Sequence, residues 1–158
     1  MKNLKKLVAV VLTLAMIISS LAVSVSASIY SDVDTSSSYA EAVDILSSLN
    51  ILKGDDEGKF NPDSDIKRSE FAAVVARALG QENAANGAKG FSKFADVSVE
   101  HWAVGYINWA AQQGIVNGRD ANTFDPDSPV KYQEAVKMLV AAIRYEPIAY
   151  VSGRYAIG

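Results

Sequence analysis

The chain has 158 residues with 15 Lys and Arg, 18 Asp and Glu, one His, no Cys and a net charge of -3. Without cysteine we expect no disulfide, no thiolate metal site and no lipoprotein anchor. The negative charge disfavours nucleic acid and anionic lipid as general partners, and the length suits one domain or two small modules sharing a core.

The first 27 residues have the three parts of a secretory signal. Three lysines form a basic start, residues 7–23 are apolar and uncharged, and Val25-Ser26-Ala27 has small residues where signal peptidase cleaves. We expect cleavage after Ala27; the alternative is an uncleaved membrane anchor, because 17 apolar residues approach spanning length. Cleavage would leave 12 basic and 18 acidic residues, a net charge of -6 and no expected membrane partner.

From residue 28 onward the chain contains an internal repeat with a shift of 64 residues. "YSDV" from residue 30 aligns with "FADV" from residue 94, and "FNPDS" from residue 60 aligns with "FDPDS" from residue 124. The register holds over about fifty residues without a gap. The repeat divides the chain into a first copy at 28–80, a Gly-, Asn- and Ala-rich connector at 81–93 that we expect to be flexible, and a second copy at 94–145.

Each copy predicts two helices joined by a glycine-rich acidic loop. In the first copy, apolar residues recur at helical spacing over residues 39–49 and again over residues 71–79. The matching stretches of the second copy are residues 107–111 and 135–143. Asn50 and Gly114, which tolerate a left-handed conformation, end the first helix of each copy. Each helix has one apolar stripe, which must pack on a neighbouring copy.

The acidic loop "GDDEGKFNPDSDIKRSEF" from residue 54 resembles a calcium-binding loop only in composition. An EF-hand needs oxygen ligands at positions 1, 3 and 5, a glycine at 6 and a carboxylate at 12. Placing Gly58 at position 6 puts Lys53 at position 1, and starting at Asp55 puts Ile66 at position 12. No register works, so we expect no calcium site.

Both copies resemble the S-layer homology (SLH) module. In that family an aromatic-x-Asp-Val opening, a Trp-Ala, a Gly-Ile-x-x-Gly, a Phe-x-Pro and a Thr-Arg-Ala-Glu helix start recur in this order. The resemblance implies a mainly α fold of tandem helix-loop-helix modules, three of which usually form a pseudo-threefold prism. It also implies binding of pyruvylated cell-wall polysaccharide. Residues 146–158 resemble the start of a third module, which suggests a truncated chain or a fragment.

The family's Thr-Arg-Ala-Glu is replaced by "KRSE" from Lys67 in the first copy and by "KYQE" from Lys131 in the second. Lysine has no acceptor, so the reciprocal capping box is broken in both copies, whereas Glu70 and Glu134 can still accept from the backbone and so serve as structural residues. The resemblance implies that Arg68 faces outward and grips a carboxylate of the polysaccharide.

The alternative for Arg68 is a surface arginine paired with Asp63 or Asp65. In the second copy Tyr132 stands at the matching position and cannot neutralise an anion, although Lys131 offers a point charge. Because each module would bury its apolar stripe on two others, we expect a chain of two modules to expose one stripe and to self-associate or be marginally stable.

Trp102 offers an indole face for stacking on a sugar, and packing at a core or module interface is the equal alternative. Its neighbour His101 has no second His or Cys, so a metal site is not expected. The carbohydrate-binding set implied by the resemblance is Arg68, Lys67, Gly54, Trp102, Lys131 and Gly118.

We expect positive φ at Gly54 and Gly118, which would let each loop approach a module or a sugar closely. Asp32 and Asp96 open the two copies, and we expect their carboxylates to bond nearby turn amides in a structural role.

The sequence thus predicts a secreted, non-catalytic module at the bacterial cell surface or in the S-layer. Its expected partner is polysaccharide linked to peptidoglycan, with other SLH or S-layer proteins as further candidates, and no cofactor. No catalytic constellation is evident, since the paired acids lie in turn-rich loops with nothing to hold them across a cleft. The alternatives are a self-assembling envelope component, or the anchoring end of an extracellular enzyme.

Overall fold

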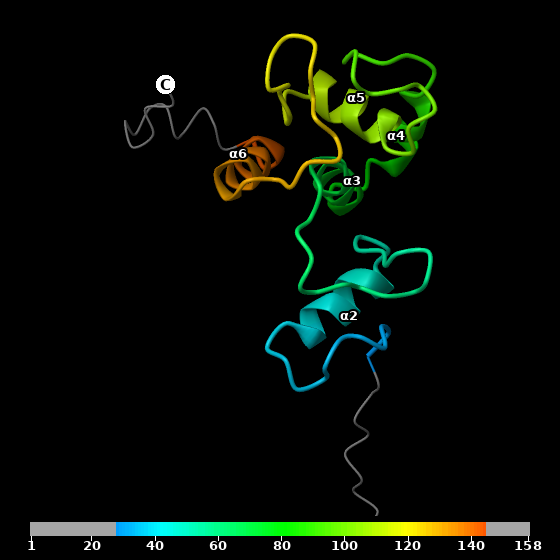
Figure 1. Ribbon diagram of the computed structural model, residues 1–158, viewed down its shortest axis with the longest axis vertical. Helices are drawn as coiled ribbons and strands as arrows, with labels where there is room; N and C mark the ends of the chain where they lie inside the picture. Colours follow the sequence, from blue (N-terminus) through cyan, green and yellow to red (C-terminus); the bar gives the residue numbers. More distant parts are fainter. Residues whose placement is uncertain (1–27, 145–158) are drawn as a thin grey trace, which may run out of the picture.

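The computed structural model describes residues 28–144 and is mainly helical, as predicted (Figure 1). The predicted signal at 1–27 and the predicted third module at 146–158 lie outside the described residues. Among the described residues, no helix is long and apolar enough to cross a membrane. The helices are α2 (Ala40–Ser48), α3 (Arg68–Ala78), α4 (Glu82–Gly87), α5 (Val104–Gln112) and α6 (Tyr132–Ala142).

The helix ends follow the sequence closely. The helices α2, α3, α5 and α6 correspond to the four predicted stretches, although α3, α5 and α6 begin three residues before their first predicted apolar position. The chain turns left-handed after the first helix of each copy, at Asn50 with φ 58° and at Gly114 with φ 71°. The predicted stop signals are confirmed.

The same aromatic pair closes the loop of each copy. The rings of Tyr30 and Phe60 lie 5.5 Å apart between centroids, and those of Phe94 and Phe124 lie 5.4 Å apart. Tilts of 34° and 36° make the two pairs nearly superimposable. The duplication seen in the sequence is therefore also a duplication of local structure.

Asp32 and Asp96 fasten the start of each copy to its loop. Asp32 accepts hydrogen bonds from the amides of Phe60 at 2.9 Å and Asn61 at 2.7 Å. Asp96 accepts from the amide of Phe124 at 2.9 Å and from the residue that follows it. We expected these carboxylates to accept hydrogen bonds from nearby turn amides. The amides that donate to them instead lie 28 and 29 residues further along the chain.

The main core combines the second helix of the first copy with the whole second copy. α3 packs against α5 and, less extensively, against α6, while α4 packs against α5. By contrast, α2 packs extensively on no other described helix and lies below the other four helices in Figure 1. Its small separate cluster contains Tyr30, Val33, Ala40 and Val43, with Phe60 packed against them.

The connector at 81–93 is not the flexible segment that its composition predicts. It contains α4, and Ala85 and Ala88 are buried in the main core. The amide of Asn108 in α5 donates to the carbonyls of Ala88 at 2.9 Å and Phe91 at 2.7 Å. Small residues here allow close packing, so the composition that suggests flexibility instead permits burial.

Candidate ligand-binding site

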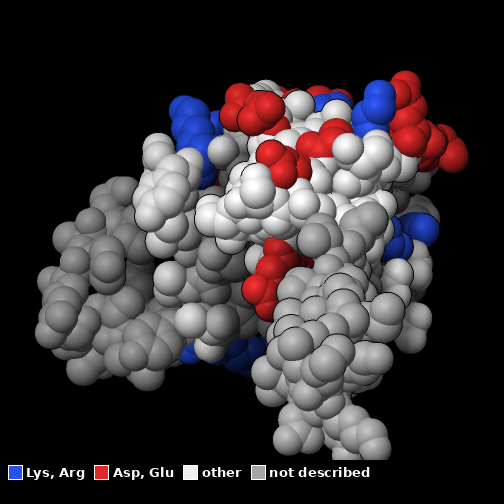
Figure 2. Space-filling model, turned by 90° about the horizontal axis from the view of Figure 1, so that it is seen from below, with Lys and Arg blue, Asp and Glu red and all other residues white. Residues whose placement is uncertain are grey.

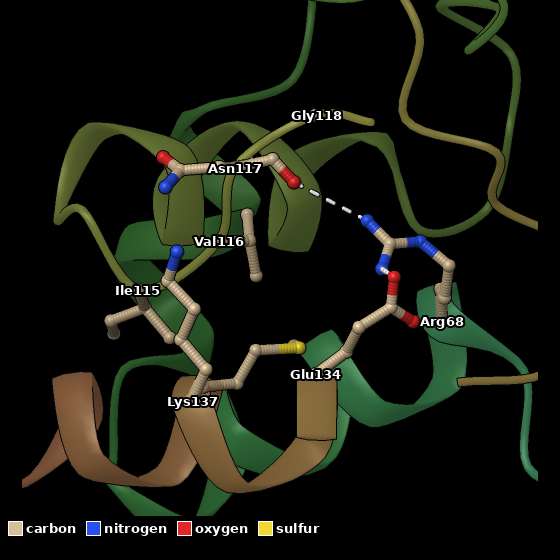
Figure 3. Close-up of a pocket in the computed structure, with 8 residues that line it drawn as sticks. Arg68, Ile115, Val116, Asn117, Gly118, Glu134 and Lys137 are labelled. Carbon is tan, nitrogen blue, oxygen red and sulfur yellow. Dashed lines mark hydrogen bonds and ion pairs between the residues drawn. The ribbon is translucent and has the colours of Figure 1, made fainter. Parts of the chain in front are cut away.

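A pocket of about 130 Å³ lies at the junction of the two copies. The start of α3, the segment after α5 and one face of α6 enclose it (Figure 3). Its lining residues are Arg68, Ile115, Val116, Asn117, Gly118, Glu134, Lys137 and Met138. Of the predicted carbohydrate-binding residues, the structure brings only Arg68 and Gly118 together here.

The side chain of Arg68 is held on every side by the second copy. Its Nε donates to the carbonyl of Phe124 at 2.9 Å, and its Nη2 donates to the carbonyl of Asn117 at 3.3 Å. Its guanidinium lies over the Phe124 ring, 4.7 Å from the centroid, which adds a cation–π contact. Only 4% of the residue is exposed.

Two expectations for Arg68 are therefore wrong. It does not face outward, and its acidic partner is Glu134 of the second copy, at 3.1 Å, instead of Asp63 or Asp65. The reason is that α3 packs beneath the second copy, so its first turn points into the junction. A buried guanidinium needs both hydrogen bonds and a counter-charge, and the junction supplies both.

Glu134 links Arg68 to a second cation. Its Oε1 lies 3.1 Å from Nη1 of Arg119, and the backbone amide of Lys131 donates to its Oε2 at 2.9 Å. Burial by itself would raise the pKa of Glu134, but the Lys131 amide and the charges of Arg68 and Arg119 together lower it below its ordinary value of 4.5. The carboxylate therefore stays ionised at neutral pH.

The start of α3 is also joined to the second copy through the backbone. The amides of Arg68 and Ser69 donate to the carbonyls of Ser128 and Pro126, each at 3.0 Å. Two amides that have no partner within the helix are thus satisfied by the neighbouring module. Together with the ion pair, these bonds define the junction on which the pocket depends.

Half of the capping box survives in each copy, as the sequence predicts. Glu70 accepts from the amide of Lys67 at 2.8 Å, as Glu134 does from that of Lys131. The other half would need an acceptor on the lysine side chain, and an ammonium group has none. The glutamates alone therefore close these helix starts.

Lys137 is a pocket residue that the sequence analysis missed. It is exposed, and its amine makes no ion pair or hydrogen bond among the described residues. Figure 3 shows it on the side of the pocket opposite Arg68, with Glu134 between them. Lys137 follows Glu134 by three residues, which places both on one helix face. This spacing is the sequence feature that could have identified Lys137.

Gly54 and Gly118 do not have the positive φ that we expected. Close packing requires glycine instead: a Cβ on Gly54 would lie 2.6 Å from the carbonyl oxygen of Lys59. A Cβ on Gly118 would collide with the Asp120 and Thr123 carbonyl oxygens. Gly118 lines the pocket, while Gly54 lies in the loop of the first copy.

The other predicted binding residues lie outside the pocket. Lys67 is exposed and pairs with Asp127 at 3.3 Å, and Lys131 is exposed at the start of α6. Trp102 is half-exposed before α5, and its ring lies 6.0 Å from that of His101. The family motif placed these residues near helix starts, but these starts do not converge on one cavity.

In the loop whose composition resembles a calcium site, Asp55 accepts hydrogen bonds from the loop itself. Asp55 accepts from the amides of Glu57 and Lys59, both at 2.9 Å, and from the side chain of Asn61 at 2.7 Å. The Lys59 amide is the largest of the causes that lower its pKa. Among the residues described here, no group of three His, Asp or Glu side chains is placed to hold a metal ion.

Acidic side chains are prominent on the surface. Figure 2, viewed from below relative to Figure 1, shows groups of Asp and Glu along the upper edge, with isolated Lys and Arg among them. Such a surface gives no broad attraction for a polyanion. An anionic ligand would have to be held by a local cation such as Lys137.

The chain belongs to the S-layer homology domain family, because the model of that family matches residues 29–72 and 93–136. These are the two copies that the repeat predicts, so that prediction is confirmed. The matches also identify the chain as a secreted protein of the bacterial cell surface, with an anchoring or S-layer role.

The relatives are much longer than this chain, and two of the three described here are named as surface proteins. The chain is 39% identical over 99% of its length to a cell surface protein of Thermoanaerobacter kivui, of which it covers 21%. It is 34% identical over 90% of its length to the surface-layer 125 kDa protein of Lysinibacillus sphaericus, covering 12%, and 34% identical over 70% of its length to an amylopullulanase of Thermoanaerobacterium thermosulfurigenes, covering 6%. The chain thus spans a minor part of each.

Proposed function

We propose that the chain is a non-catalytic anchoring module that binds secondary cell-wall polysaccharide in the pocket between α3, residues 115–118 and α6. The observation that carries the proposal is this pocket, where Lys137, free of ion pairs among the described residues, stands across from the Arg68–Glu134 pair. The likeness to both a surface-layer protein and an amylopullulanase also supports attachment as the shared role, independent of what is attached.

A pyruvyl ketal on the polysaccharide would present a carboxylate to Lys137. Arg68 already bonds two carbonyls and Glu134, so a bidentate grip by Arg68 would require the ligand to displace Glu134. We therefore assign the anionic contact to Lys137, and to Arg68 the role of fixing the wall of the pocket. The Glu134 carboxylate and the Asn117 amide are suited to hydrogen-bond sugar hydroxyls.

A polymer extends beyond a pocket of this size, so residues outside it have a place in the proposal. Trp102, half-exposed, offers a stacking face for a sugar at another point of the chain. Lys67 and Lys131 are exposed cations at the starts of α3 and α6. We expect each of them to contribute less than Lys137, because none lines the pocket.

The test is co-sedimentation of the chain with purified peptidoglycan that carries its polysaccharide, before and after chemical removal of pyruvate. We expect Lys137→Ala to weaken binding about tenfold, as for loss of one charged contact. Lys89→Ala is the matched control, an exposed lysine that lies outside the pocket and outside the residues assigned to binding. If Lys137→Ala and the wild type sediment alike in both conditions, the carboxylate contact is wrong.

A further inference from the structure

The internal repeat relates two uncovered helix faces to a helix pair that is already packed. α3 packs against α5 in the main core. A shift of 64 residues takes α3 onto α6 and takes α2 onto α5. The helices α6 and α2 therefore carry the two halves of an interface that this chain already forms once.

The first half is the exposed face of α6. Its apolar side chains recur at helical spacing and are Tyr132, Val136, Leu139 and Ile143, all of them exposed. Three of the four equivalent positions are covered: Arg68 is 4% exposed where Tyr132 is 85%, and Val75 is 3% exposed where Leu139 is 51%. The fourth, Leu79, is 39% exposed. Contact with the second copy is what covers α3, and no described element covers α6 in the same way.

The second half is the exposed face of α2. Ala42 and Ile45 are exposed, and Ile45 is 50% so. Their equivalents in α5 are Tyr106 and Trp109. Tyr106 faces α3, because its ring lies 5.1 Å from the guanidinium carbon of Arg77. α2 thus exposes the face that α5 turns toward α3.

Backbone groups extend the match. In the junction that is formed, the amides at the start of α3 donate to the carbonyls of Ser128 and Pro126. The equivalent groups are the amides of Tyr132 and Gln133 and the carbonyls of Ser64 and Pro62. Among the described residues these four groups do not make the corresponding bonds. Both halves of a second junction are therefore present, polar groups included, and they do not meet.

We propose that the exposed face of α6 binds the α2 unit, residues 28–66, of a second copy of this chain, as α3 binds α5. Within one chain α2 and α6 make no extensive contact, and they lie apart in Figure 1, with α6 beside α3 and α2 below it. Since each chain carries one face of each kind, the contact is head-to-tail and does not pair a face with itself. This proposal is independent of polysaccharide binding.

The experiment is sedimentation velocity on the chain from residue 28, over about 1 to 100 micromolar, a range suited to a modest interface. We expect the wild type to associate with rising concentration. Leu139→Glu destroys the α6 face and Ile45→Glu destroys the α2 face, so each variant should be monomeric. An equimolar mixture should form a heterodimer, because one intact face of each kind remains.

Val99→Glu is the matched control, since Val99 is an exposed apolar residue in a turn outside both faces, and this variant should associate like the wild type. Circular dichroism establishes that each variant is folded. The proposal is overturned if the wild type stays monomeric, which would leave the face to another segment or partner. It is equally overturned if Ile45→Glu alone still associates, which would indicate pairing of α6 with α6, or if the mixture of variants does not associate.

Discussion

The aromatic clusters of the two copies have the same geometry and different surroundings. Phe60 and Phe124 have equivalent ring partners, and their amides have equivalent aspartate acceptors. Yet Phe124 is fully buried in the main core, whereas Phe60 is only partly buried, against the small cluster that includes residues of α2. The difference arises because α3 packs onto the second copy and no described helix packs in that way onto the first.

This contrast separates two levels of structure. A Phe-x-Pro loop, a preceding aromatic and an aspartate are enough to build the local cluster, since both copies build it. Burial depends on a helix from the other copy packing onto the cluster, and among the described residues only the second copy is packed in this way. Equivalent substitutions in the two copies should therefore have equivalent local effects and unequal effects on stability.

The largest expected difference is between Phe124→Ala and Phe60→Ala. Removing a fully buried phenylalanine costs about 3 to 5 kcal/mol of unfolding free energy, and removing a half-buried one should cost about half of that. Both tryptophans, Trp102 and Trp109, belong to the second copy. Urea unfolding followed by tryptophan fluorescence should therefore shift strongly for Phe124→Ala and little for Phe60→Ala. Equal shifts would mean that the two copies unfold as one unit.

The next difference is between Glu134→Ala and Glu70→Ala. Loss of Glu134 leaves the buried Arg68 without its counter-charge, which we expect to cost about 2 to 3 kcal/mol because Glu134 is partly exposed. Glu70 caps its helix through one backbone bond, and its loss should cost about 0.5 to 1 kcal/mol. Urea midpoints measure both, and a Glu70→Ala cost as large as that of Glu134→Ala would contradict the role of the junction.

Glu134→Ala should also differ from the wild type in its dependence on pH. Because folding lowers the pKa of Glu134, its contribution is present above its ordinary value of 4.5 and is lost as the pH falls below it. The wild type should therefore lose stability on acidification in that range, and Glu134→Ala should lose less. An unchanged acid dependence in Glu134→Ala would mean that other carboxylates govern acid unfolding.

The helices and the repeat were predictable because they depend on spacing and on stop residues such as Asn50 and Gly114. Burial of Arg68 was not, since a helix start rich in charge gives no sign of which module will cover it. Its partner Glu134 lies 66 positions away, and only the packing of α3 on the second copy brings the two together. The motif analysis favoured helix starts, and therefore overlooked Lys137 in the interior of α6.

The glycines show a similar limit. Gly54 and Gly118 were expected to have positive φ, but a sequence does not distinguish a glycine required by φ from one required by contact. Gly114 is the first kind and Gly118 the second. The connector at 81–93 shows the same limit of sequence reasoning. Small residues such as Ala85 and Ala88 suit a flexible segment as well as the close packing that they make here.

The smallest expected difference concerns the helix ends at Gly114 and Asn50. A Cβ at Gly114 would contact nothing within 4 Å, so the cost of Gly114→Ala is that of its φ of 71° alone, about 1 to 2 kcal/mol. Asn50 already adopts φ 58°, and Asn50→Gly should change stability by less than about 0.5 kcal/mol. We expect Gly114→Ala to lower the midpoint of thermal unfolding and Asn50→Gly to leave it unchanged, as measured by thermal melts followed by tryptophan fluorescence. An equal loss in both would mean that φ alone does not set the cost at these two helix ends.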